Sequence, residues 1–488
     1  MRFIAALAML LLSGCAAGPD FTRPAAPEVS AYTAHPLPAT VAGGEIQRFS
    51  AGMNIPADWW TLFHSGPLNE LIEEALKNNP DLKSAQAALS AARENVLAQR
   101  GAYYPGVAAS FSASRQNQSS MLAPAPNYPV VANEFQYTLL TPQLSVSYVP
   151  DVFGVNRRTV ESLQAQEQGV RFQMIATYNT LTANLVVAAI QQGALQTQLD
   201  ATRRLIALNS KMVQILQYQF AKGYASRLDV SAQESQLAQV NATLPPLLKQ
   251  AAQSRHLLAV LAGRFPNQAP AGTFELSSLK LPEDLPLSLP SRLVAQRPDV
   301  RQAEANLHAA SAQVGIAAVS RLPSIELSAN IGSTALAMGQ VFGSGTGFWG
   351  LGAALTAPIF QGGSLLHRER AAKAAYVQAA EQYRSTVLTA FQNVADTLAA
   401  LEQDAGGVKA AAAAADAARL TLDLTTRQWR DGYSGYLALL GAKQAYQQAR
   451  INLVQAQANR YADTAALFQA LGGGWWQRAD LSQDKDEK

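Results

Sequence analysis

The only cysteine of the chain, Cys15, is the residue whose surroundings define its chemistry most closely. It follows Leu12-Ser13-Gly14, and upstream lie the basic residue Arg2 and an apolar stretch over residues 3–12. A stretch of this length is too short to span a bilayer as a permanent helix, so residues 1–14 are predicted to be a cleaved export signal. The thiol can carry a thioether-linked diacylglycerol. This pattern predicts a lipoprotein that is acylated at Cys15, with palmitate among its acyl chains.

The residue after Cys15 indicates where such a lipoprotein is sorted. Position 16 is alanine and not the aspartate that retains lipoproteins at the inner membrane of enteric bacteria, which favours the outer membrane. Once Cys15 is acylated, no thiol remains for a disulfide, a metal site or catalysis. The alternative is an ordinary signal peptide followed by a cysteine by chance.

Other residues that could do chemistry form no recognisable pattern. The five histidines are scattered, and the chain has neither a Gly-x-Ser-x-Gly elbow nor a phosphate-binding loop with its lysine. The sequence therefore predicts no enzyme, no cofactor and no metal site. With 38 basic and 35 acidic residues and no basic cluster, nucleic acid is not expected as a partner.

The elements that carry these residues occur twice along the chain. Asn79-Pro80-Asp81-Leu82 recurs as Arg297-Pro298-Asp299-Val300, which shifts position 80 to position 298. The segment from Gln219 to Tyr224 recurs from Gln428 to Tyr433, which shifts position 223 to position 432. We interpret this as a tandem duplication. The second shift is smaller than the first by nine, so the first copy has a longer connection between Pro105 and Gly154.

Each copy is predicted to contain a very long helix. No proline lies between Pro150 and Pro245 or after Pro358, and proline is the residue that breaks helix interiors. Glycines at positions 154 and 223 bound the first stretch and glycines at 363 and 432 bound the second, so the two stretches are equal in length. At 1.5 Å per residue such a helix is on the order of 100 Å long.

A heptad pattern in the first long helix indicates that it packs as a coiled coil. Alternate steps of three and four residues give thirteen positions, of which ten are apolar. Taken alone, this pattern also fits a soluble coiled coil. The positions are Tyr178, Leu181, Leu185, Ala188, Gln192, Leu195, Leu199, Thr202, Ile206, Asn209, Val213, Leu216 and Phe220.

Between the helices, each copy has two segments in which apolar and polar residues alternate. They cover residues 107–114, 143–148, 325–332 and 349–357. After the predicted signal peptide, no run of about 18 apolar residues offers a membrane-spanning helix. A strand with one apolar and one polar face suits the wall of a barrel that has lipid outside and water inside. A β-sandwich shows the same alternation. Four strands are too few to close into a barrel, and the eight strands of a dimer would form a barrel that is filled by its own side chains. A trimer gives twelve strands, which can close around a lumen.

Loops rich in Pro, Gly, Ser or Asn are expected between the strands of each copy, over residues 119–134 and 334–347.

The expected organisation of the chain has six parts. The parts are a signal peptide (1–14), a lipid-anchored, extended N-terminal arm (15–64), a first repeat (65–263), a Pro-rich linker (264–290), a second repeat (291–472) and a C-terminal tail (473–488).

With these residues in place, the chain resembles the TolC family of outer-membrane efflux proteins, in the NodT/OprM-like lipoprotein branch that serves RND-type multidrug pumps. The resemblance covers essentially the whole chain. It is carried by Cys15 with its preceding Leu-Ser-Gly, Gly18-Pro19-Asp20-Phe21, Trp59-Trp60, Asp151-Val152-Phe153-Gly154, Gln296-Arg297-Pro298-Asp299, Pro358-Ile359-Phe360 and Leu471-Gly472-Gly473-Gly474-Trp475.

The resemblance implies a mixed α/β membrane protein that is lipid-anchored in the outer membrane. Each protomer would contribute four transmembrane strands to a 12-stranded barrel, and the long coiled-coil helices would form a periplasmic α-barrel. The implied function is a passive, trimeric exit channel of a tripartite RND-type pump. Its implied partners are two further copies, a periplasmic adaptor (membrane fusion) protein, an inner-membrane RND transporter and outer-membrane lipid.

The family closes its periplasmic tip near the turns that follow the long helices. Members commonly place an aspartate ring just after the second turn, but here the matching positions are Ala438 and Gly441. The chain therefore lacks that ring, and a carboxylate gate is not expected.

We hypothesise instead a gate formed by other residues of the two turns. Tyr436 and Leu437, with Trp429, would form an apolar constriction, and Arg227 and Asp229 would make polar contacts between helices. The alternative is that these residues only pack a helical hairpin.

Two other functions fit parts of the sequence. One is a type I secretion exit channel for polypeptides, which the lipidation pattern disfavours. The other, from a different class, is a periplasmic coiled-coil adaptor or scaffold lipoprotein. It accounts for the heptads and the lipid but not for four alternating strands that are duplicated together with the helices.

Overall fold

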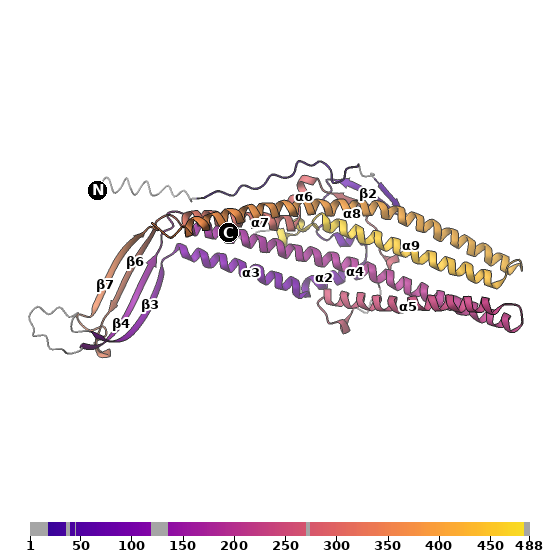
Figure 1. The fold of residues 1–488 in the computed structure, drawn as a ribbon, viewed down its shortest axis with the longest axis horizontal. Helices are drawn as coiled ribbons and strands as arrows, with labels where there is room; N and C mark the ends of the chain where they lie inside the picture. The colour runs from indigo at the N-terminus through magenta and orange to yellow at the C-terminus, as the bar shows by residue number, and fades with distance from the viewer. Residues whose placement is uncertain (1–17, 36–39, 44, 119–134, 270–273, 483–488) are drawn as a thin grey trace, which may run out of the picture. The chain divides into compact units, whose positions relative to one another are not determined.

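The computed structural model describes residues 18–35, 40–43, 45–118, 135–269 and 274–482 (Figure 1). The predicted signal peptide and Cys15 lie outside these residues. The first copy contains α2 (Gly66–Asn78), α3 (Pro80–Arg100), β3 (Gly106–Gln118), β4 (Phe135–Tyr148), α4 (Val155–Ala221) and α5 (Arg227–Leu261). The second copy contains α6 (Pro290–Gln296), α7 (Pro298–Val319), β6 (Ser324–Ser333), β7 (Gly347–Thr356), α8 (Ser364–Arg430) and α9 (Tyr436–Ala470).

The tandem-repeat fold with very long helices is confirmed. The helices α4 and α8 each have 67 residues, and α5 and α9 each have 35. Equivalent contacts also recur. Asn79 Nδ2 donates to the carbonyl of Leu261 over 3.0 Å, and at the equivalent position Arg297 donates from a terminal nitrogen to the carbonyl of Ala470 over 2.9 Å. The same connection is therefore made by different side chains in the two copies.

The end of each shorter helix is held against the start of its own copy by a glycine. Gly263 has φ 77° and Gly472 has φ 104°, in the left-handed region that favours glycine. A Cβ atom would lie 2.8 Å from the carbonyl oxygen of Asn78 at the first position and 2.6 Å from that of Gln296 at the second. Any larger residue at either site would force two backbone segments apart.

The heptad seam of α4 is buried along most of its length. Ten of its thirteen positions, from Tyr178 to Val213, are buried, whereas Ile206 and Leu216 are half-buried and Phe220 is 44% exposed. In the buried part, Leu195 and Leu199 pack with Ala251 of α5. The predicted coiled-coil packing is confirmed there, and it loosens toward the turn.

The helix α5 runs through two adjacent prolines, Pro245 and Pro246. Each proline removes one backbone donor and disfavours a helix interior. The segment is largely exposed, so water can bond the carbonyls that the prolines leave without a partner. The helix therefore continues farther than the proline-free stretch indicated.

The strands β3, β4, β6 and β7 form one antiparallel sheet in that order. Gly106 pairs with Ser147 in the first hairpin, and Ser324 pairs with Thr356 in the second. The shift of position 80 to 298, applied to β3, and the shift of position 223 to 432, applied to β4, convert the first pair into the second. Both hairpins thus have the same register, and the nine additional residues of the first copy fall within 119–134, which lies outside the described residues.

The two faces of this sheet differ in chemistry, as the alternation predicted. Aliphatic and aromatic side chains lie on one face, and Leu351 and Trp349 there are 79% and 75% exposed. The opposite face is richer in polar side chains, among them Ser110, Ser145, Asn330 and Glu326. In the described part of the chain the sheet is open, with β3 and β7 as its outer strands.

A second sheet has no counterpart among the elements predicted from the sequence. The strands β1 (Thr40–Gly43) and β2 (Glu45–Ala51) lie in the predicted arm, and β5 (Asp284–Leu287) lies in the predicted linker. Both segments look irregular in sequence because they are short and contain Pro and Gly. The strands β2 and β5 pair in parallel, although the whole first repeat separates them along the sequence. Local sequence patterns carry no signal for a pairing between such distant segments.

The described chain divides into two compact units. One contains the residues up to Arg23 with Ser90–Gln168 and Glu304–Glu381, and includes the four-stranded sheet. The other contains the described residues of Pro24–Leu89 and Gly169–Ala303 and those from Gln382 onward. Each unit draws residues from both copies of the repeat.

In the second unit, a buried arginine lies beside a pair of carboxyl groups. Arg460 of α9 is 1% exposed; its Nε donates to Gln47 Oε1 over 3.0 Å, and a terminal nitrogen donates to the carbonyl of Glu45. Burial, together with the neighbouring carboxyl of Asp463, raises the pKa of Asp404 to about 7. Within the described residues, the buried Oδ2 of Asp404 has no donor partner. A proton shared between the two carboxyls supplies one and leaves a single negative charge opposite Arg460.

We expect this pair to make thermal stability depend on pH. The folded-state pKa of Asp404 lies above its ordinary value of 3.8, so folding favours the protonated form. The resulting stabilisation is present below pH 4 and is lost as the pH rises through 7. Because the carboxyl is partly exposed, we expect a loss on the order of 1 kcal/mol between pH 5 and 7.5. In melting curves of the detergent-solubilised protein, Asp404→Asn should flatten this profile.

The control is Asp423→Asn, which changes an exposed carboxylate of the same helix. It should keep the wild-type profile. An Asp404→Asn protein whose melting temperature varies with pH as in the wild type would contradict the shared proton.

Candidate functional site

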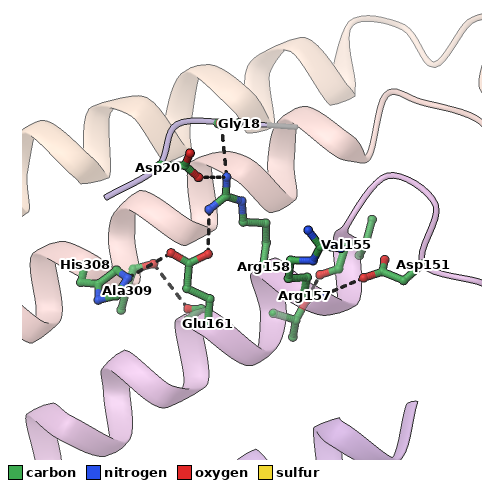
Figure 2. Close-up of polar contacts among 11 residues, drawn as sticks. Gly18, Asp20, Asp151, Val155, Arg157, Arg158, Glu161, His308 and Ala309 are labelled. Carbon is green, nitrogen blue, oxygen red and sulfur yellow. Dashed lines mark hydrogen bonds and ion pairs between the residues drawn. The ribbon is translucent and has the colours of Figure 1, made fainter. Parts of the chain in front are cut away.

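The N-terminus of α4 is fixed by the loop that leaves the four-stranded sheet. Both carboxylate oxygens of Asp151 accept backbone hydrogen bonds, one from Asn156 over 2.9 Å and the other from Arg157 over 2.8 Å (Figure 2). These bonds satisfy donors that a helix start leaves free, and the negative charge suits the positive end of the helix dipole. The start of α4, and with it Arg158, is therefore held relative to the sheet.

Arg158 is a buried cation that binds the N-terminal segment of the chain. It is 3% exposed, and its terminal nitrogens bond to Glu161 over 2.7 Å and to Asp20 over 2.8 Å (Figure 2). It also donates to the carbonyl of Gly18 over 3.3 Å. Burial alone would lower the pKa of Arg158, but the bonds to the two carboxylates raise it, so the guanidinium remains charged.

Two more contacts hold the same segment against α7. The ring of Phe21 stacks on His308, with centroids 4.3 Å apart, and Nε2 of His308 lies 3.0 Å from Oε1 of Glu161. Farther along, Arg23 forms an ion pair with Glu304 over 3.0 Å. We call residues 18–23 the docked segment. His308, one of the scattered histidines, thus has a packing role in this cluster.

These residues form no pattern in the sequence that indicates a function. Gly18-Pro19-Asp20-Phe21 contributes only to the family resemblance. A buried arginine is a stronger signal in retrospect, but nothing in the sequence around position 158 shows that the side chain is buried.

The turns that follow the long helices have one backbone geometry. Gly223 and Gly432 have φ 77° and 78°, and the next residue donates a backbone bond over 2.8 Å, from Tyr224 to Gln219 and from Tyr433 to Gln428. This is the helix-ending arrangement for which glycine is preferred. The predicted equivalence of the two turns is confirmed.

The helices that begin after these turns are capped differently. At the start of α5, Ser226 and Asp229 form a capping box, in which Asp229 Oδ2 accepts from the backbone and the hydroxyl of Ser226. These bonds lower the pKa of Asp229. The equivalent residues of the second copy are Gly435 and Ala438, and Gly435 provides no side-chain cap.

The structure brings some of the candidate gate residues together. Trp429 and Tyr436 are in ring contact, with centroids 5.6 Å apart. Leu437, from the second turn, lines an open cleft together with Asp229 from the first. Arg227 is exposed. Asp229 bonds to residues of its own turn. The interhelical contact that we hypothesised for it is therefore not formed within a single chain.

Across the described residues, no helix combines the length and the apolar character that crossing a membrane requires.

We expect the docked segment to be released when Arg158 is neutralised. Arg158→Met removes the charge that binds Asp20 and Gly18. Arg158 is buried, but the side chain of Asp20 is 92% exposed, so losing the ion pair costs on the order of 1 kcal/mol. Hydrogen exchange of the amides of residues 20–23, followed by mass spectrometry, should become faster by up to about fivefold. The control Arg370→Met changes an exposed arginine of the same unit and should leave these rates unchanged. Unchanged exchange in Arg158→Met would show that the ion pairs do not hold the segment.

Comparison with known proteins gives relatives that match over nearly the full length. Outer membrane protein OprJ of Pseudomonas aeruginosa is 28% identical over 480 residues, covering 96% of this chain and 95% of the relative. Nodulation protein T of Rhizobium leguminosarum bv. trifolii is 29% identical and covers 97% of each chain. Among solved structures, the outer-membrane channel OprN gives a TM-score of 0.80 at 26% identity, over 95% of this chain and all of the other.

Another solved structure, the open state of the MtrE outer membrane channel of Neisseria gonorrhoeae, gives a TM-score of 0.79 at 25% identity, over 96% of this chain and all of the other. The chain also matches the sequence pattern of the family described as outer membrane efflux protein, over residues 71–264 and 289–473. Those ranges cover well over half of the sequence and include nearly all of both copies of the repeat. The chain therefore belongs to the outer membrane efflux protein family.

Proposed function

We propose that this chain is the passive outer-membrane exit channel of a tripartite RND-type multidrug efflux pump and that it works as a homotrimer. The observation that carries the proposal is the four-stranded sheet with one exposed apolar and one polar face, joined to helices of 67 residues. Relatives that match over nearly the full length bear the names antibiotic efflux pump and toluene efflux pump outer membrane protein.

The backbone of the sheet supports trimer formation. The outer strands β3 and β7 present donors and acceptors that one chain leaves open at the sheet edges, and a membrane offers them no water. Three copies give twelve strands that can close into one continuous sheet. Its apolar face then contacts lipid, and its Ser, Asn and Gln side chains line a water-filled passage.

The passage is suited to conduction rather than to selection. Its polar face carries mostly short neutral side chains such as Ser112, Ser147 and Asn330, which form hydrogen bonds with water, and one carboxylate per chain, that of Glu326. Choice of the exported compound then belongs to the partners, a periplasmic adaptor protein and an inner-membrane RND transporter. No energy-coupling or catalytic role falls to this chain.

The docked segment supports anchoring by lipid at Cys15. Position 15 is close to position 18 in the chain, so the backbone can place the lipid at most about 10 Å from Gly18. Gly18 is bonded to Arg158, near the start of α4 and close in sequence to the end of β4. An acylated Cys15 would thus be tethered near the base of the sheet in the outer membrane. The signal peptide of residues 1–14, the arm, the two repeats, the linker and the tail remain our proposed division of the chain.

For the gate, we retain the two turns as the proposed periplasmic constriction. The contact of Trp429 with Tyr436 and the position of Leu437 in the cleft shared with the first turn support an apolar closure. Arg227 and Asp229 would then contact neighbouring copies. The absence of acidic residues at Ala438 and Gly441 argues against closure by cations.

The two faces of the sheet should respond in opposite ways to a charge. Leu351→Arg places a cation on the apolar face, at a cost of about 2–4 kcal/mol per copy near the membrane midplane. Ser328→Arg places the same cation on the polar face of the neighbouring strand. On an unheated gel of outer-membrane fractions, we expect a heat-sensitive trimer for the wild type and Ser328→Arg, and its loss for Leu351→Arg. A monomer in the inner membrane for the wild type would refute the channel and favour an adaptor.

A strain that lacks the gene should be drug-sensitive. It should regain resistance when it expresses the wild type or Ser328→Arg, but not when it expresses Leu351→Arg.

The apolar closure is tested by conductance. Leu437→Ser replaces the side chain at the cleft with a small polar one, and we expect the open current of single channels in planar bilayers to rise several-fold. Leu420→Ser, at an exposed position on α8, is the control and should conduct as the wild type does. If Leu437→Ser gives no increase, the residue only packs the hairpin.

A further inference from the structure

The connection between β6 and β7 folds back over the apolar face of the sheet. Strand alternation and a bridge to β4 place Ser333 and Ala335 on this face. Ile331, on the same face, is 59% exposed, but Ser333 and Ala335 are only 2% and 4% exposed. The covering residues belong to the connection, because the backbone N–H of Phe342 donates to the hydroxyl of Ser333 over 3.2 Å. We call residues 336–346 the flap.

The flap holds Phe342 in a conformation that an aromatic residue rarely adopts. Its φ is 68°, in the left-handed region, which is unfavourable for a bulky side chain. The flap keeps this shape because the hydroxyls of Ser333 and Thr346 are hydrogen-bonded over 2.8 Å and Thr346 also donates to the carbonyl of Gly343. The ring of Phe342 is nevertheless 79% exposed, so it fills no core of this chain. It is placed for contact with a molecule outside the chain.

An apolar groove begins at the flap and follows the inner strands of the sheet. Its first part, of about 550 Å³, is bordered by Phe342 and lined by Ala109, Leu144 and Ile331. A second part, of about 250 Å³, shares Leu144 and Ile331 and extends to Trp349. The first part alone has the size of a small-molecule site, about 300–1,000 Å³. Because β4 and β6 are inner strands, the groove stays open to lipid when the outer strands pair with other copies.

A single cation lies beyond the outer end of this groove. In the described strands, Arg115 of β3 is the only charged side chain on the apolar face. It is about 14 Å along the strand from Phe111, on the side away from the helices. Its guanidinium donates to Gln136 over 3.4 Å, and its five N–H groups allow it to bind a phosphate as well. A cation at the end of an apolar groove is complementary to a lipid with an anionic head group.

We propose that the groove, the flap and Arg115 form a binding site for a phosphate-bearing lipid of the outer leaflet. The proposal rests on the channel proposed above, in which the helices lie in the periplasm and the flap end of the sheet faces the exterior. The phosphate-bearing lipid of that leaflet is lipid A, a phosphorylated glucosamine disaccharide with several acyl chains. One acyl chain lies against Leu144 and Ile331, the ring of Phe342 covers it, and a phosphate bonds to Arg115.

The site is tested by titrating lipids into the detergent-solubilised, full-length trimer and measuring binding by native mass spectrometry. The probes are lipid A with both phosphates, lipid A from which the phosphates have been removed, and phosphatidylglycerol. We expect the phosphorylated lipid A to bind at least about fivefold more tightly than the dephosphorylated form, because its phosphate pairs with a guanidinium. It should also bind more tightly than phosphatidylglycerol.

Variants assign the two contacts separately. Arg115→Gln should weaken the binding of phosphorylated lipid A about fivefold and abolish the preference for phosphate, whereas Arg115→Lys should keep that preference. Phe342→Gly removes the ring and relieves the backbone strain, so the trimer should remain intact while both forms of lipid A bind about fivefold more weakly. The control Arg370→Gln removes an exposed arginine of α8 and should bind as the wild type does.

Three results would overturn the site while leaving the channel intact. They are equal binding of the two forms of lipid A, equal binding of lipid A by the wild type and Arg115→Gln, and binding of phosphatidylglycerol as tight as that of lipid A. A wild type that forms no heat-sensitive trimer would instead refute the proposed channel, and the lipid site with it.

Discussion

The structure depends on one constraint, which is that a four-stranded sheet with an exposed apolar face cannot satisfy its own backbone or cover its own surface. The outer strands β3 and β7 leave one row of donors and acceptors each, and residues such as Leu351 and Trp349 are largely exposed. In water both features would favour aggregation, whereas the proposed trimer in a lipid environment would satisfy them together. The unpaired backbone groups of β3 and β7 are therefore the reason that each chain needs partners.

The duplication determines how that need is met. Two copies of the same plan give two hairpins of equal register and two long helical pairs of equal length. Contacts at equivalent positions are kept even where the residues differ, as with Asn79 and Arg297, which both reach a carbonyl at the end of the shorter helix. What the duplication preserves is the path of the backbone, and the side chains need only be compatible with it.

Much of this could be predicted because the signals are local. Proline-free stretches and a heptad seam identified the long helices, and alternation over residues 107–114 and 349–357 identified strands. The small sheet of β1, β2 and β5 could not be predicted, since its strands are short and β2 pairs with a strand beyond the whole first repeat. The burial of Arg158 and the pairing of Asp404 with Asp463 also depend on packing between distant segments. Such sites are found only once the helices that carry them are placed side by side.

The two turns keep one backbone geometry, but the helices that follow them differ in how firmly their first residues are capped. Both close with a left-handed glycine and the same backbone bond, so their paths are alike. The first is additionally held by the capping box of Ser226 and Asp229, and a side-chain cap contributes about 1 kcal/mol to a helix start. Gly435 and Ala438 give the second turn no such bond. The start of α9 is therefore the less firmly fixed of the two, and it is there that Tyr436 and Leu437, the apolar residues of the proposed gate, are located.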